Sequence, residues 1–156
     1  MAQPAPLSPT IGATERTLFA LLNSRLERQG ISFPEWTVMF FLGSDRLPRS
    51  VVLSRLASGR VVEGEAAVSL IDAMVKTGRI EIVKVGREDE PYVMLTAAAE
   101  STFFPLRAEV AAAAQKIYAG ISQEDIETTR RTLEQVGRQA AALLRGAATT
   151  QPPHSA

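Results

Sequence analysis

Apolar side chains recur at helical spacing along most of the chain. Between Ala13 and Gln29, Leu18, Leu21, Leu22 and Leu26 follow an i, i+3, i+4 pattern, so one face of a helix is apolar there. From Ser32 to Leu42 apolar residues lie on every side of the next helix, which predicts the most buried helix of the fold. Ser32 and Glu35 have the spacing of a capping box, which predicts where this second helix begins.

Two further helices and a hairpin follow. The pattern predicts a short helix over Arg49–Ala57 and a longer one over Gly64–Thr77, with Gly78 at the position of a terminating glycine. The period then changes, and Arg79–Val85 and Tyr92–Leu95 have the composition of strands around a polar turn. We therefore expect a β-hairpin with an exposed tip, and the element order of a winged helix-turn-helix.

Two long helices close the predicted fold, one from Thr96 to Ala119 and one from Ser122 to Arg145. The last extends roughly 34 Å at about 1.5 Å per residue, which is longer than a small winged domain is wide. Its apolar stripe therefore needs another partner, and a second copy of the chain is the simplest one. The residues assigned to dimer packing are Leu18, Leu22, Phe104, Leu133, Val136, Ala140 and Leu143.

Composition excludes several kinds of chemistry. The 156 residues contain 17 basic and 17 acidic side chains, and this zero net charge argues against a strongly basic protein that coats RNA. The absence of cysteine excludes disulfides, thiolate nucleophiles and cysteine-ligated metals. His154 is the only histidine and lies in a polar tail. We expect no enzyme, no cofactor and no metal site.

The chain ends and the apolar runs indicate in which cellular compartment the protein is expected. No apolar run approaches the roughly 20 residues that span a bilayer, and the N-terminus has no signal-peptide pattern, so we expect a cytoplasmic protein without membrane contact. The predicted organisation is a single domain over 13–146 between flexible tails. Its parts are the tail 1–12, the helix 13–29, the winged core 32–96, the helices 97–145 and the tail 147–156.

Four segments together resemble one protein family. They are Pro34–Val38 (PEWTV), Leu70–Ile80 (LIDAMVKTGRI), Val93–Thr96 (VMLT) and Gly120–Asp125 (GISQED). In this order and spacing the chain resembles the MarR family of winged-helix regulators, from about residue 14 to residue 144. The resemblance implies a mainly α fold with a small β-hairpin wing and a homodimer built by the first, fifth and sixth helices. It also implies a fourth helix in the DNA major groove and regulation by a small aromatic or phenolic ligand.

Eight polar residues are candidates for DNA contact. The arginines on or beside the third helix would bind phosphates, the serines would bond to phosphates or base edges, and the wing cations would approach the minor groove. Each has an alternative role. The arginines would be ordinary surface residues, Ser50 a helix cap and Ser69 part of a solvated face. The wing cations would be neutralised by the acidic residues beside them. The candidates are Arg46, Arg49, Ser50, Arg55, Arg60, Ser69, Lys84 and Arg87.

Three residues are candidates for an effector site. Trp36 and Phe40 lie on the second helix, which contributes to the effector pocket in the family, although buried aromatic residues more often belong to a core. Arg25 on the first helix would pair with an acidic ligand, and a solvent-facing or intersubunit ion pair is the alternative.

Two function hypotheses follow. The first is a dimeric regulator, a repressor relieved by a small ligand, whose two recognition helices meet a pseudo-palindromic operator about one helical turn apart. The second is a winged-helix module that binds a ligand or a protein and binds DNA weakly or not at all. The second is motivated by Ala73 at a usually basic position, by Glu63 and Glu65, and by the eight basic and eight acidic residues between positions 45 and 90.

Overall fold

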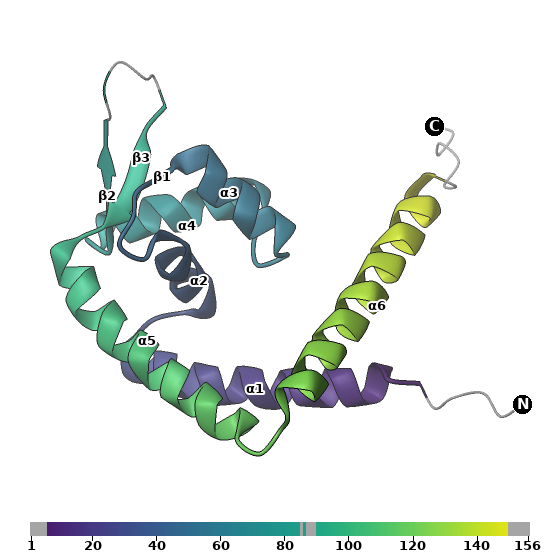
Figure 1. The fold of residues 1–156 in the computed structure, drawn as a ribbon. Helices are drawn as coiled ribbons and strands as arrows, with labels where there is room; N and C mark the ends of the chain where they lie inside the picture. The colour runs from purple at the N-terminus through teal and green to yellow at the C-terminus, as the bar shows by residue number, and fades with distance from the viewer. Residues whose placement is uncertain (1–5, 85, 87–89, 150–156) are drawn as a thin grey trace, which may run out of the picture. The chain divides into compact units, whose positions relative to one another are not determined.

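The computed structural model describes residues 6–84, 86 and 90–149, which form six helices and three short strands (Figure 1). This mainly helical fold with a small antiparallel sheet confirms the predicted winged-helix class. The helices are α1 (Ser8–Arg28), α2 (Phe33–Leu42), α3 (Arg49–Ser58), α4 (Gly64–Lys76), α5 (Ala97–Tyr118) and α6 (Gln123–Thr149). The strands are β1 (Leu47–Pro48), β2 (Ile80–Val83) and β3 (Tyr92–Leu95).

The chain divides into two compact units, and the boundary follows Ala113 within α5. The first unit contains α1 to α4, the sheet and most of α5. The second contains the end of α5 and all of α6. The predicted single domain over 13–146 therefore includes both units.

The start of α2 is the capping box that the sequence predicts. The Ser32 backbone N–H donates to Glu35 Oε2 at 2.7 Å, and the Glu35 N–H donates to Ser32 Oγ at 3.4 Å. Pro34 lies in the first turn, where a missing N–H costs nothing. Trp36, Val38, Met39 and Leu42 are buried, a larger share than in the other helices, as predicted.

One hydrophobic cluster joins every element of the first unit. Helices α1 to α5 contribute such fully buried side chains as Leu26, Met39, Ile71 and Phe103. Strand β3 contributes Val93, which is also fully buried. All charged side chains of the described residues stay at least partly exposed.

The sheet has the order β1–β3–β2 and is antiparallel throughout. Across β2 and β3, Ile80 lies opposite Leu95 and Ile82 opposite Val93, while Leu47 of β1 pairs with Val93 on the other side. The hairpin was predicted, although β2 is shorter than the predicted strand. Strand β1 was not predicted, because two residues that include a proline carry no period-two pattern.

Both terminal helices extend beyond their predicted limits. Helix α1 begins at Ser8, inside the span predicted as a flexible tail, because Pro9 suits a first helical turn. Helix α6 runs to Thr149 rather than to Arg145, because the intervening Ala147 and Ala148 are strong helix formers. The tails predicted for 1–12 and 147–156 are therefore partly wrong.

Candidate nucleic-acid interface

Helices α3 and α4 form the helix-turn-helix pair, and a tight turn joins them. The backbone N–H groups of Arg60 and Val61 donate to the carbonyls of Ala57 and Leu56, both at 3.0 Å. This geometry places Arg60 in the left-handed region with φ of 54°, the one non-glycine residue with positive φ among the described residues. Its side chain is exposed beside a shallow hollow that Ala57 and Glu63 also line.

Helix α4 presents one face to the core and the opposite face to solvent. Ala67, Ile71 and Met74 are buried. We call the opposite set the α4 outer stripe; it comprises exposed side chains at Glu65, Ala66, Ser69, Asp72, Ala73 and Lys76. Ser69, a predicted DNA contact, therefore lies on the face that solvent or a ligand can reach.

Arg49 links the start of α3 to α4 and to the wing. Its Nη2 lies 2.8 Å from Asp72 Oδ1, and its backbone N–H donates to the Pro91 carbonyl at 2.9 Å. The Arg49 side chain is 28% exposed and Asp72 is 62% exposed. The arginine is thus held by the fold, while the carboxylate remains accessible on the α4 outer stripe.

Ser50 is not the cap of α3, so that alternative is wrong. The N-cap residue is Pro48, which has no side-chain hydrogen bond. Instead, the Ser50 backbone N–H donates to Glu90 Oε1 at 3.0 Å. A carboxylate from the β2–β3 loop therefore satisfies one amide at the start of α3, where the helix dipole favours negative charge. The Ser50 side chain is exposed.

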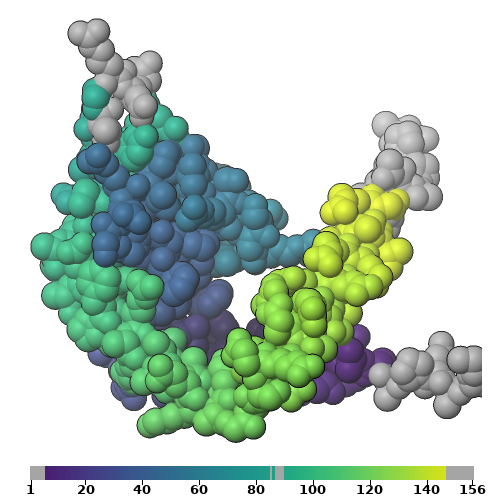
Figure 2. Space-filling model, in the orientation of Figure 1, coloured from purple at the N-terminus to yellow at the C-terminus, as the bar shows by residue number. Residues whose placement is uncertain are grey.

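The other predicted cations are distributed around this surface. The Arg55 guanidinium lies over the Phe41 ring at 5.7 Å, and Arg46 and Lys84 are exposed. Figure 2 shows that the surface of the first unit includes atoms of α3. Arg87 lies outside the described residues. The structure therefore places the described candidates on α3, its flanking turns, α4 and the wing, and all of them except Arg49 are exposed.

Two of the three predicted effector residues lie together on α2, in contact with α5. The Trp36 ring is buried, with its centroid 5.4 Å from Phe103 and 6.3 Å from Phe40. Phe40 is 55% exposed, and the Arg107 guanidinium lies over its ring at 5.5 Å. Trp36 is thus a core residue at the edge of an exposed aromatic surface. Sequence reasoning missed Arg107, because nothing in the local pattern places this α5 cation beside α2.

Arg25 makes an ion pair within one chain, whereas the alternative considered for it was a solvent-facing or intersubunit pair. Its Nε lies 3.3 Å from Glu109 Oε1 on α5, and its Nη1 donates to the Leu21 carbonyl at 2.8 Å. Arg28 pairs with the same carboxylate at 2.5 Å. Two cations of α1 therefore share one acid of α5, and the guanidinium of Arg25 is engaged within the chain.

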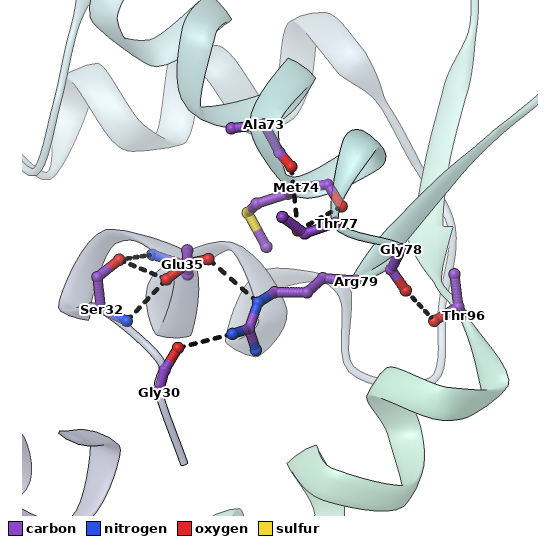
Figure 3. A network of polar contacts seen from close by, with 9 residues as sticks. All are labelled: Gly30, Ser32, Glu35, Ala73, Met74, Thr77, Gly78, Arg79 and Thr96. Atoms are coloured by element: carbon purple, nitrogen blue, oxygen red, sulfur yellow. Dashed lines mark hydrogen bonds and ion pairs between the residues drawn. The ribbon is translucent and has the colours of Figure 1, made fainter. Parts of the chain in front are cut away.

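The network in Figure 3 joins the α1–α2 turn to the end of α4. Arg79 Nε lies 3.1 Å from Glu35 Oε1, and Arg79 Nη2 donates to the Gly30 carbonyl at 2.6 Å. Thr96 Oγ1 donates to the Gly78 carbonyl at 2.7 Å and also caps α5 through the Ala99 N–H. The polar groups that border the end of α4 are thus tied to α2 and α5.

The residues assigned to dimer packing are largely uncovered within their own units. In the first unit, Leu22 packs partly against the core, and Leu18 and Phe104 are exposed. In the second unit, α6 has no buried residue between Gln123 and Gly146. Its exposed apolar positions include Leu133, Val136, Ala140 and Leu143. These four are spaced by three and four residues, so they form one stripe along the helix.

Charged side chains of α6 interact with one another along the same helix. Arg130 Nη2 lies 2.6 Å from Glu127 Oε1, and Arg130 also pairs with Glu134. The hydrogen bond from Arg130 holds the pKa of Glu127 below its ordinary value, and Glu127 in turn raises the pKa of Arg130. These pairs support the helix rather than a reaction, because all three groups face solvent.

Other kinds of site are not evident in the described part of the chain. No group of three or more histidine or acidic side chains has the arrangement of a metal site there. No helix within 6–84 and 90–149 combines the length and apolarity needed to cross a membrane.

Comparison with solved structures identifies the fold. The structure of NadR with 4-hydroxyphenylacetate aligns with a TM-score of 0.68 at 14% identity, covering 87% of this chain and 95% of that chain. A cysteine-to-serine mutant of E. coli MarR with operator DNA aligns with a TM-score of 0.68 at 18% identity, covering 84% and 93%. A MarR-family regulator from Silicibacter pomeroyi gives 0.60 at 18% identity, covering 84% and 90%. No protein-family model and no curated protein sequence matches the chain. The chain therefore has the winged-helix fold of these regulators.

Proposed function

We propose that the chain is a MarR-family regulator that binds double-stranded DNA as a homodimer. The observation that carries this proposal is the fold match over 93% of a MarR chain solved on operator DNA. Low sequence identity leaves residue roles to be argued from this chain itself. The α3–α4 pair, the wing and the uncovered α6 stripe each support the proposal independently.

The proposed DNA surface consists of the α4 outer stripe and the cations around it. Helix α4 enters the major groove, where an α-helix fits, and Ser69 faces the base edges. The exposed cations contact phosphates and set the register of the protein on the duplex. These cations are Arg46, Arg55, Arg60 and Lys84, with Arg87 of the wing as a further candidate.

The proposed dimer buries the apolar stripe of α6. Leu133, Val136, Ala140 and Leu143 recur at the spacing of a helix–helix seam, and water otherwise covers them. Leu18, Leu22 and Phe104 of the first unit add further apolar surface for a partner subunit. Two such subunits would present two α4 helices to half-sites about 34 Å apart, which requires a pseudo-palindromic operator.

We also propose that the protein represses transcription until a small aromatic ligand binds. The support is the exposed Phe40 ring beside Trp36, with the Arg107 guanidinium over it. Arg25 contributes only if its pair with Glu109 opens. A ligand that binds better to a dimer with mismatched half-site spacing shifts the population away from DNA. NadR, one of the similar structures, was solved with 4-hydroxyphenylacetate. Because its partner is chromosomal DNA, we place the protein in the cytoplasm.

Selection from a random duplex pool tests the proposed function. The purified chain is expected to enrich an inverted repeat whose half-site centres are one helical turn apart. Its affinity for that repeat should fall steeply with salt, because several phosphate contacts release counterions. In a matched variant, Arg46→Ala, the slope of log affinity against log salt concentration should become less steep by about one. Failure to enrich any sequence at low salt would refute the proposal.

The second candidate is an interaction module that does not bind DNA. The observation in its favour is local charge neutrality, since Asp72 pairs with Arg49 and Glu90 covers an amide of α3. Such a module should bind generic duplex almost not at all, even at low ionic strength. The same salt titration therefore separates the two functions.

A further inference from the structure

The α4 outer stripe is rich in hydrogen-bond acceptors and methyl groups and poor in donors. Glu65 and Asp72 offer carboxylates, Ala66 and Ala73 offer methyl groups, and Ser69 offers a hydroxyl. We infer that α4 reads its half-site through base amino groups and thymine methyls, and not through the acceptor edge of guanine. This inference rests on the proposed function and adds the class of sequence that is bound.

The argument begins with what each base presents in the major groove. Cytosine presents the N4 amino donor, adenine presents N6 as a donor and N7 as an acceptor, and thymine presents O4 and a methyl group. Guanine presents two acceptors, N7 and O6, which arginine or lysine commonly bonds. A carboxylate can only accept a hydrogen bond, so Glu65 and Asp72 suit cytosine N4 and oppose guanine.

The cations near the α4 outer stripe lie where they cannot bond to guanine in place of the stripe residues. Lys76 is the one basic residue of α4 and is the last residue of the helix, about one turn beyond Asp72 and Ala73. Arg49 lies beside the stripe, but its Nη2 is bonded to Asp72 Oδ1 and its backbone to Pro91. Arg49 is therefore a positioning residue that orients Asp72 and leaves Oδ2 to accept from a base.

The two alanines complete the stripe. Ala66 and Ala73 lie two helical turns apart on the exposed face, roughly 10 Å along the axis. Their side chains are single methyl groups, and alanine makes apolar contact with the thymine methyl. Small side chains also let the helix backbone lie close to the base edges, which brings the hydroxyl of Ser69 between them within reach.

Modified duplexes test this inference on the full-length chain. The enriched operator is synthesised with 7-deazaguanine for guanine, which removes N7, or with deoxyuridine for thymine, which removes the methyl group. We expect 7-deazaguanine to leave the dissociation constant within about twofold, and deoxyuridine at one or two half-site positions to weaken binding about fivefold. In the Ala73→Gly variant one deoxyuridine penalty should disappear, and Ala108→Gly, the same change at an exposed position of α5, is the control that keeps every deoxyuridine penalty.

The Glu65 carboxylate provides a second, independent readout. Glu65→Gln replaces a group that only accepts with one that also donates, at nearly the same size. Repeated selection with this variant should relax the cytosine preference at one position, while thermal unfolding shows that the exposed substitution leaves the fold intact. A tenfold loss with 7-deazaguanine, or an unchanged selected sequence in E65Q, would overturn this inference and leave DNA binding itself standing. Absence of any bound duplex would instead refute the proposed function, and this inference with it.

Discussion

Arg79, between α4 and strand β2, forms an ion pair with Glu35 in the first turn of α2 (Figure 3). The distance between Arg79 Nε and Glu35 Oε1 is 3.1 Å. Both side chains are largely shielded, with exposures of 24% and 19%. The other oxygen of Glu35 closes the capping box with Ser32. One carboxylate thus starts a buried helix and fixes the residue that precedes strand β2, so its loss should affect both.

Glu35→Ala should lower the free energy of unfolding by about 2 kcal/mol, because it removes a capping partner and leaves Arg79 without its acid. Urea unfolding measures this change. Glu15→Ala on the exposed face of α1 is the matched control, and it should change stability by less than about 0.5 kcal/mol. A double-mutant cycle with Arg79→Met isolates the ion pair, and additive effects would show that the pair contributes nothing.

Arg60→Gly should stabilise the fold and weaken DNA binding at the same time. Arginine in the left-handed region carries a steric cost that glycine avoids, so unfolding should become more difficult by about 0.5 to 1 kcal/mol. Loss of one phosphate contact should lower the salt slope by about one. Arg60→Lys keeps both the charge and the backbone strain, so it should match the original chain in both measurements. Equal DNA affinity in R60G would exclude Arg60 from the interface.

How much the sequence predicted depends on whether a feature is local. The capping box of Ser32 and Glu35 and the boundaries of β3 follow from residues adjacent in the chain, and the structure confirms them. The Arg79–Glu35 pair and the Arg107–Phe40 contact join residues far apart in sequence, so no spacing rule indicates them. The exposed DNA candidates were selected by charge and helix face, which accounts for their location but leaves their roles as predictions.

Arg49 shows why charge alone is an insufficient guide to a site. As a basic residue at the start of α3 it was assigned to a phosphate, yet its guanidinium is bonded to Asp72. Only the tertiary fold brings these two helices close enough for that pair. Strand β1 has the same origin, because Leu47 becomes a strand residue only through its pairing with Val93.

Val136→Asp should convert the protein from a dimer to a monomer. A charge in the middle of the α6 stripe would be desolvated without a partner in a dimer, whereas it stays hydrated in a monomer. Light scattering should show the mass falling from twice 16.8 kDa to 16.8 kDa. Gln135→Asp adds the same charge one position away on the exposed helix and should remain dimeric. A monomeric original chain would contradict the proposed assembly.

The pKa of Glu127 should respond to Arg130. The folded pKa lies below the ordinary value of 4.5, so the stabilising effect is present above that value and is lost as the pH falls through the folded pKa. A carbon-detected NMR titration of the carboxyl group should show this depressed pKa. Arg130→Gln should return the pKa toward 4.5, while Arg145→Gln, more than four turns away, should leave it unchanged. An identical titration in R130Q would disprove the assigned cause.

Glu90→Gln should strengthen DNA binding without releasing the wing. The amide oxygen of the new glutamine can still accept from the Ser50 N–H, so the contact between the wing and α3 persists. The substitution removes one negative charge beside the proposed contacts with DNA phosphates. We expect affinity for the selected operator to rise about threefold at low salt, with the gain shrinking as salt screens the surface. Glu81→Gln on strand β2, an exposed acid of the wing outside the α3 contact, is the control for a general change in net charge. If both substitutions raise affinity equally, net charge rather than the position of Glu90 is the cause. If E90Q lowers affinity, the carboxylate is needed to position α3, and Glu90 supports DNA binding instead of opposing it.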